Sequence, residues 1–174
     1  MLYMTFIISP QTRDTTPDNE HEIHTVIIDN NDHSSKVNFT AFLPTPLENV
    51  VQARLITATL TTTGYLTQTA LHIGVEELRS YFSQRTKSDL ESANDNHLNG
   101  KFGTIIGNHI ALAPSSATKV MIFRDEYPIL QEYHTPIRKL DRLTFNIHKQ
   151  DGDTAQLGDS VFVFKFTCKK MNLS

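Results

Sequence analysis

Near the C-terminus, large apolar side chains alternate with smaller or polar ones, and this alternation constrains the fold more than any other feature of the sequence. The large members recur at every second position: Phe162, Phe164, Phe166 and Cys168. A period of two is that of a β-strand with one face buried. We therefore predict a strand here, in a sheet that packs one face against a core.

A second alternation lies just upstream, from Leu143 to Ile147. Asp151-Gly152-Asp153 separates it from the last strand and has the composition of a turn. We expect the two strands to be antiparallel and joined as a hairpin. Leu140 is out of phase with the alternation, which indicates a bulge or bend near Asp141.

Other strand-like segments occur earlier in the chain. Val37 to Leu43 alternates in the same way, and Pro44-Thr45-Pro46 is expected to end that strand. Val50 to Thr63 is rich in Val, Ile and Thr on both phases, which predicts a long strand covered on both faces along part of its length. The weaker strand predictions are Leu2 to Ile8, Glu22 to Asp29, Thr69 to Ile73, Phe102 to Ile106, Ile110 to Leu112 and Lys119 to Arg124.

Only one segment has helical spacing. Val75, Leu78 and Phe82 recur as on one face of a helix, with charged residues between them. Residues 14–19, 30–35 and 86–100 are polar and are expected to be surface loops. About eight short strands, one short helix and long polar loops together predict an all-β, antiparallel sandwich or barrel.

Length and composition fit one domain. The chain has 174 residues and a formal net charge of −3, and its basic residues are scattered, so no direct nucleic-acid binding is expected. It shows no secretory signal pattern and no apolar run long enough to span a bilayer, so no transmembrane segment is expected. Cys168 is the only cysteine, which excludes an intrachain disulfide and a thiolate zinc cluster.

Residues that often carry catalysis or hold metals form no recognised pattern. The densest histidine group, His21, His24 and His33, has no glutamate or cysteine at a known ligand spacing. The chain lacks the His-x-His pair of a cupin metal site, and the run from Asp151 to Asp159 lacks the spacing of a calcium loop. Nucleophile-elbow, Walker A and dinucleotide-binding glycine patterns are also absent. We predict no catalytic residue, no metal site and no cofactor, and therefore a protein that is not an enzyme.

The run from Leu140 to Ile147 reads Leu-Asp-Arg-Leu-Thr-Phe-Asn-Ile, and an Asp-Gly turn and a strand ending at Phe166 follow it. This arrangement resembles the C-terminal end of the jelly-roll capsid proteins of large double-stranded DNA viruses and virophages. Shorter similarities in the same order are found at Leu47 to Leu55, Leu71 to Phe82 and Phe102 to Ile105.

This resemblance implies a single jelly-roll, because the chain is about half as long as a double jelly-roll major capsid protein. It implies a penton subunit that forms a homopentamer at a vertex of the virion and contacts the major capsid protein and other capsid proteins. No catalytic residue comes with that family. Two alternatives stay open: a minor capsid protein elsewhere in the shell, and a carbohydrate-binding or attachment domain without enzymatic activity.

Residues 1–20 are predicted separately from the domain at residues 21–174. They are either an arm that adds to the sheet of a neighbouring subunit or the first strand of the chain's own sandwich. The apolar residues of this possible partner-contact arm are Leu2, Tyr3, Phe6, Ile7 and Ile8.

Overall fold

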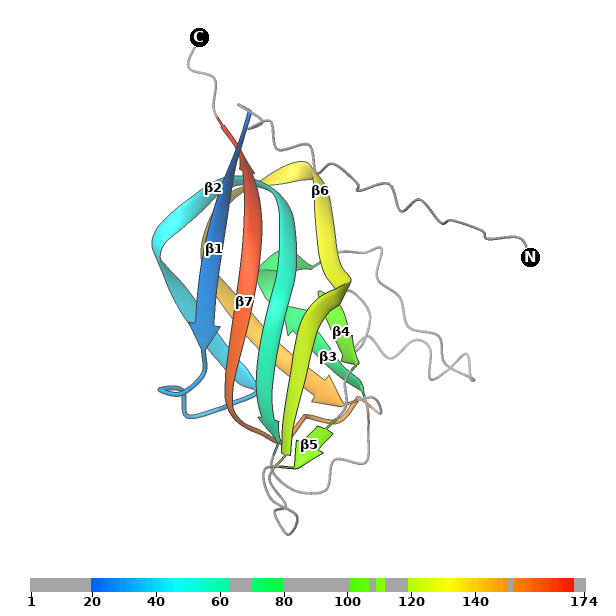
Figure 1. Cartoon of the computed structure of the whole chain (residues 1–174). Helices are drawn as coiled ribbons and strands as arrows, with labels where there is room; N and C mark the ends of the chain where they lie inside the picture. The colour runs from blue at the N-terminus through cyan, green and yellow to red at the C-terminus, as the bar shows by residue number, and fades with distance from the viewer. Residues whose placement is uncertain are drawn as a thin grey trace, which may run out of the picture.

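The computed structural model describes residues 20–62, 70–79, 101–106, 109–111, 119–149 and 152–170. Nearly all of them lie in antiparallel strands, which confirms the predicted all-β class (Figure 1). The strands are β1 (His21–Asp29), β2 (Asn38–Thr62), β3 (Ala70–Val75), β4 (Gly103–Ile106), β5 (His109–Ala111), β6 (Lys119–Lys149) and β7 (Leu157–Lys169).

Two long strands organise the fold. β2 has 25 residues and β6 has 31, and they pair with each other from Asn38 to Thr62 of β2. Within β2, only the second part, residues 50–62, pairs with β7. Within β6, only the last part, residues 145–149, pairs with β3. The ladder β1-β7-β2-β6-β3-β4 therefore folds over on itself into two layers.

We name these layers by their strands. Layer A contains β1, β7, residues 50–62 of β2 and residues 119–132 of β6, with β5 beside β6. Layer B contains residues 38–48 of β2, residues 137–149 of β6, β3 and β4. Figure 1 shows both long strands bending from one layer into the other.

Aromatic side chains fill the space between the layers. Phe39 and Phe145 of layer B stack with ring centroids 4.7 Å apart, and Phe162 of layer A lies 5.2 Å from Phe145. Phe145 and Phe164 also meet across the layers. Because Phe162, Phe164, Phe166 and Cys168 are all buried, the predicted inward face of the last strand is confirmed.

The pairing of the two long strands is interrupted where they bend. Residues 43–46 of β2 lie opposite Asp141, and residues 133–136 of β6 lie opposite Val51. Pro44, Pro46 and Pro136 fall in these unpaired stretches, where the missing N–H of proline removes no ladder bond. Asn49 has a φ of 52°, a left-handed conformation that asparagine tolerates better than most residues.

The interruption beside Asp141 confirms the bulge predicted there from the phase of Leu140. The prediction that Pro44-Thr45-Pro46 ends the strand is wrong, because the backbone stays extended and resumes pairing at Leu47. The predicted strands at Glu22–Asp29, Thr69–Ile73, Phe102–Ile106, Ile110–Leu112 and Lys119–Arg124 correspond to β1, β3, β4, β5 and the start of β6.

The hairpin predicted between Leu143–Ile147 and the last strand is only partly right. Asp153 O accepts from Lys149 N, and Gly152 has a φ of 96°, so the expected turn forms. The two strands do not pair, however, since β6 ends in layer B and β7 runs in layer A between β1 and β2. The turn thus carries the chain from one layer to the other.

Only the start of the predicted helix lies within the described residues, and it is not an α-helix. Val75 is the last residue of β3, and only Glu76–Leu78 turns, as a single 3-10 turn with Leu78 buried. Phe82 lies outside the described residues, as do the strand predicted at Leu2–Ile8 and the loops predicted at residues 14–19 and 86–100. Residues 30–35 form the connection between β1 and β2, as expected.

Candidate functional site

One side of the sandwich is open in the described part of the chain. There β1 forms the edge of layer A, and residues 38–48 of β2 form the edge of layer B. Each edge pairs with a strand on one side only. Two hollows lie between these edges, and both are open to solvent.

The first hollow has a volume of about 300 Å³ and lies between Val26–Asp29 of β1 and Thr40–Pro44 of β2. Most of its lining residues are apolar, but Asp29, Asp32 and His33 also line it, so the wall is mixed in polarity. Ile27 is 69% exposed and Phe42 is 73% exposed, which is unusual for large apolar side chains. Exposed apolar residues that lie together mark a surface suited to contact with another protein.

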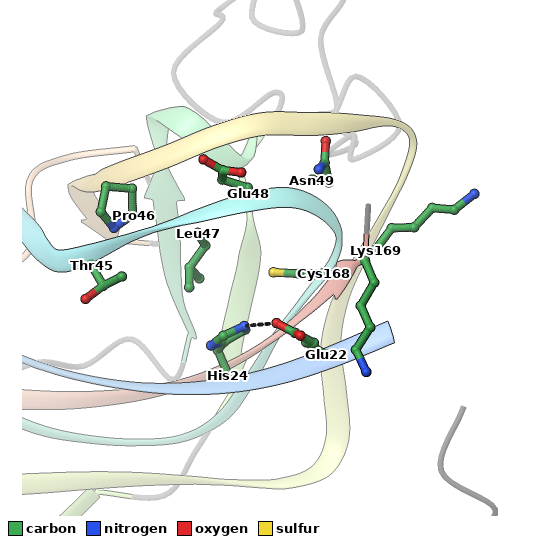
Figure 2. Close-up of a pocket in the computed structure, with 10 residues that line it drawn as sticks. Glu22, His24, Thr45, Pro46, Leu47, Glu48, Asn49, Cys168 and Lys169 are labelled. Carbon is green, nitrogen blue, oxygen red and sulfur yellow. Dashed lines mark ion pairs between the residues drawn. The ribbon is translucent and has the colours of Figure 1, made fainter. Parts of the chain in front are cut away.

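The second hollow, of about 440 Å³, lies between Glu22 and His24 of β1 and residues 45–49 of β2 (Figure 2). It is more polar. His24 Nε2 lies 3.6 Å from Glu22 Oε2, and both side chains are about half exposed. Cys168 lies at its floor, where burial, with a smaller contribution from Glu22, raises the pKa of the thiol. A raised pKa keeps the thiol protonated, so Cys168 is poorly suited to act as a nucleophile.

The outer face of layer A carries a further apolar surface. Val161 of β7, Thr59 of β2 and Ile122 of β6 are register partners and lie in one row across it. Six large apolar side chains of the described residues are markedly exposed, and five share this face: Ile23, Ile27, Ile122, Leu130 and Val161. The face thus combines apolar and β-branched side chains with charged ones, since Lys165 and Arg54 lie in one row with Leu130.

The densest histidine group of the sequence, His21, His24 and His33, does not form a cluster in the structure. His24 pairs with Glu22, whereas the ring of His33 packs on Phe39 with centroids 4.9 Å apart. Within the described residues, no three or more His, Cys, Asp or Glu side chains lie close enough together to hold a metal ion.

Two other histidines are brought together by the fold. His72 of β3 and His148 of β6 are register partners, although they are far apart in the sequence. His72 Nδ1 lies 2.8 Å from Thr104 Oγ1, and His148 Nδ1 lies 3.0 Å from the carbonyl oxygen of Gly152. These bonds tie β3 to β4 and fix the turn after β6, so both rings have structural roles.

A polar cluster fixes the 3-10 turn to layer B. Glu77 accepts hydrogen bonds from Thr144 N at 2.7 Å and from Thr144 Oγ1 at 2.8 Å. Lys101 Nζ donates to Asn146 Oδ1 nearby. Burial, and secondarily the Arg79 charge, lower the pKa of Lys101. Because each of these groups bonds a neighbouring strand or turn, the cluster stabilises the fold.

The five residues of the predicted partner-contact arm, Leu2, Tyr3, Phe6, Ile7 and Ile8, lie outside the described residues. The prediction also overlooked Ile23, Ile27 and Phe42, which the structure places at the open side. For Ile27 the signal was present, because β1 is apolar on both phases near Val26–Ile28. None of the helical turns in the described residues is long and apolar enough to cross a membrane.

No protein-family model matches the chain, and no curated protein matches it.

Proposed function

We propose that this chain is a single jelly-roll capsid protein that acts as a penton subunit. Five copies would form a ring at a vertex of the virion and contact the major capsid protein and other neighbouring capsid proteins. The role is structural, carried by surfaces and not by a catalytic site.

The path of the chain through the two layers is the observation that supports this proposal most strongly. A jelly-roll has eight strands in two sheets, folded as two Greek keys. Here the two long strands each contribute one segment to each layer. Of the eight segments in chain order, the first, third, sixth and eighth lie in layer A: β1, residues 50–62 of β2, residues 119–132 of β6, and β7. The second, fourth, fifth and seventh lie in layer B: residues 38–48 of β2, β3, β4, and residues 137–149 of β6.

The sheet order agrees with this path. Layer A has the order β1, β7, β2, β6, and layer B has the order β2, β6, β3, β4. In each layer, strands from opposite ends of the chain lie side by side, as Greek-key connections require. The similarity of Leu140–Ile147 and its following turn to jelly-roll capsid proteins supports the same proposal.

A rigid sandwich with an exposed apolar face is suited to ring formation. A head-to-tail contact uses two different surfaces of each copy and closes when the rotation between copies divides a full turn. The outer face of layer A, with Ile122 and Val161 exposed near its centre, provides one such surface. Exposed apolar residues that form a patch mark a surface suited to contact with another protein.

The test is the mass and shape of the full-length chain in solution. Light scattering at high concentration is expected to give about five times the subunit mass of 19.7 kDa, and negative-stain microscopy is expected to show rings. Ile122→Lys is expected to weaken the ring, whereas Glu48→Lys, on the other side of the sandwich, serves as a control. A monomer at every concentration, with no rings, would contradict the penton role.

A carbohydrate-binding or attachment domain is the competing function, because the same architecture supports many functions. Sugar sites often use exposed aromatic rings. Tyr133 is the one mid-chain tyrosine whose side chain the structure describes, and its hydroxyl donates to Leu78 O at 3.2 Å. A glycan array with the isolated subunit separates the two, since reproducible binding would favour the attachment function.

A further inference from the structure

The free edge of β1 presents unused backbone groups. Lys170 N donates to Glu20 O at 2.8 Å and Asn30 N donates to Ser160 O at 3.2 Å, so the even-numbered residues of this segment bond toward β7. In an antiparallel pair the residues between them point their N–H and C=O groups to the other side. Ile23, Thr25 and Ile27 therefore direct theirs toward the open side, where no described strand pairs with β1.

Between Glu22 and Asp29, at residues 23–28, this edge lacks the features that normally prevent another strand from adding. β1 pairs with β7 in unbroken register over all nine of its residues, so it has no bulge. It contains neither proline nor lysine. Natural edge strands usually carry one of these features or are covered.

An added strand would meet apolar surface on both of its faces. On the outer side it would lie beside Ile23 and Ile27, which are 60% and 69% exposed. On the inner side it would lie over the first hollow, against Leu43 and Pro44 of β2. A segment that fits here must therefore be apolar on both phases, unlike a strand with one face in water.

The N-terminal segment of the chain meets this requirement. Leu2–Ile8 has seven residues, close to the nine of β1, with large apolar residues on both phases and no charge. Its first proline and its first charged side chain come later, at Pro10 and Arg13. The twelve residues from 9 to 20 can span up to about 40 Å, enough to reach an adjacent molecule.

We propose that the free edge of β1 binds the segment Leu2–Ile8 of a second copy of this chain as an added strand. Backbone hydrogen bonds to Ile23, Thr25 and Ile27 would hold the segment, and its side chains would cover Ile23 and Ile27 on the outer face and the first hollow on the inner face. The contact is independent of the five-fold ring, because it requires only two copies.

Cross-linking between full-length chains tests the proposal. In a Cys168→Ala background, one copy carries Phe6→Cys and the other Thr25→Cys, and the mixture is treated with a short bismaleimide. A covalent dimer of the two variants is expected. Thr59→Cys is the matched control, because Thr59 is an exposed threonine on β2, two strands away from the edge.

Two outcomes would overturn the proposal. One is a yield with Thr25→Cys no higher than with Thr59→Cys. The other is an internal link in a chain that carries both Phe6→Cys and Thr25→Cys, with no dimer from the mixture, since the segment would then bind its own β1.

A charge at the edge gives an independent measurement. Ile27→Lys is expected to reduce the yield of the cross-linked dimer at least about tenfold. Val161→Lys, on the same face of the adjacent strand, is expected to leave the yield unchanged. An unchanged yield with Ile27→Lys would contradict the proposal. Cross-linking without rings contradicts the penton role alone, whereas rings without cross-linking contradict this contact alone.

Discussion

Asn30 is a buried polar residue whose loss is expected to destabilise the sandwich. Its side chain is fully buried and joins the start of the β1–β2 connection to β7. Asn30 Oδ1 accepts from Ser160 N at 2.7 Å, and Asn30 Nδ2 donates to Lys36 O at 2.8 Å and to Gly158 O at 3.2 Å. Asn30→Ala removes all three bonds at once.

The magnitude follows from what each partner loses. A buried donor left without an acceptor costs about 1–3 kcal/mol, which applies to Ser160 N. Each of the two carbonyl bonds contributes about 0.5–1.5 kcal/mol. We expect Asn30→Ala to lower the free energy of unfolding by about 3 kcal/mol, a large part of the 5–15 kcal/mol usual for a domain.

Urea denaturation followed by far-UV circular dichroism measures this change. In a thermal unfolding experiment, the melting temperature is expected to fall by about 6–12 °C, at roughly 2–4 °C per kcal/mol for a chain of this size. Asn31→Ala is the control, because Asn31 is the same residue type one position later and is exposed. If the two variants differ by less than about 0.5 kcal/mol, the reasoning about buried hydrogen bonds at this site is refuted.

Two buried groups give further predictions. Burial raises the pKa of Tyr133 well above its ordinary value, so its stabilising effect is present below about pH 10 and is lost as the pH rises further. Tyr133→Phe is expected to lower the free energy of unfolding by about 1 kcal/mol at pH 7, because it removes the hydrogen bond to Leu78 O. In urea titrations the difference in free energy between the variant and the unaltered protein is expected to shrink toward pH 11, and a constant difference would contradict this. Cys168 is buried and the pKa of its thiol is raised. Iodoacetamide at pH 8 is therefore expected to modify it about 100-fold more slowly in the folded chain than in urea, as measured by mass spectrometry. Equal rates would count against its burial.

Local alternation was enough to predict the core strand. The period-two placement of Phe162 and Phe164 is a property of neighbouring residues, and both side chains pack between the layers as predicted. The phase break at Leu140 likewise predicted the interruption beside Asp141, because a change of phase requires an extra residue somewhere in the ladder.

The length of the two central strands was not predictable by the same reasoning. Pro44 and Pro136 indicate strand ends when only local rules are used. In the structure they lie where β2 and β6 bend and their pairing is interrupted, so no hydrogen bond is lost there. Strand partners were also beyond reach, since β7 pairs with β1 and β2 and not with the strand next to it in sequence.

The candidate site was predicted only in part. Apolar residues near the N-terminus indicated a contact with a partner, but the surface that could receive them depends on which strand lies at the edge. That position is a property of the whole topology, and β1 occupies it because β7 covers its other side. The exposure of Phe42 depends likewise on its place in the edge strand of layer B, where it is in register with Arg142.

The passage of β2 and β6 through both layers has a consequence for how the molecule comes apart. A sandwich made of two separate sheets can lose one of them first, whereas here each sheet contains part of the same two strands. Most contacts join residues that are distant in the chain, so loop closure must precede most of the gain from packing, and folding is expected to be slow. Unfolding is correspondingly expected to be a single cooperative event, in which neither sheet survives the loss of the other.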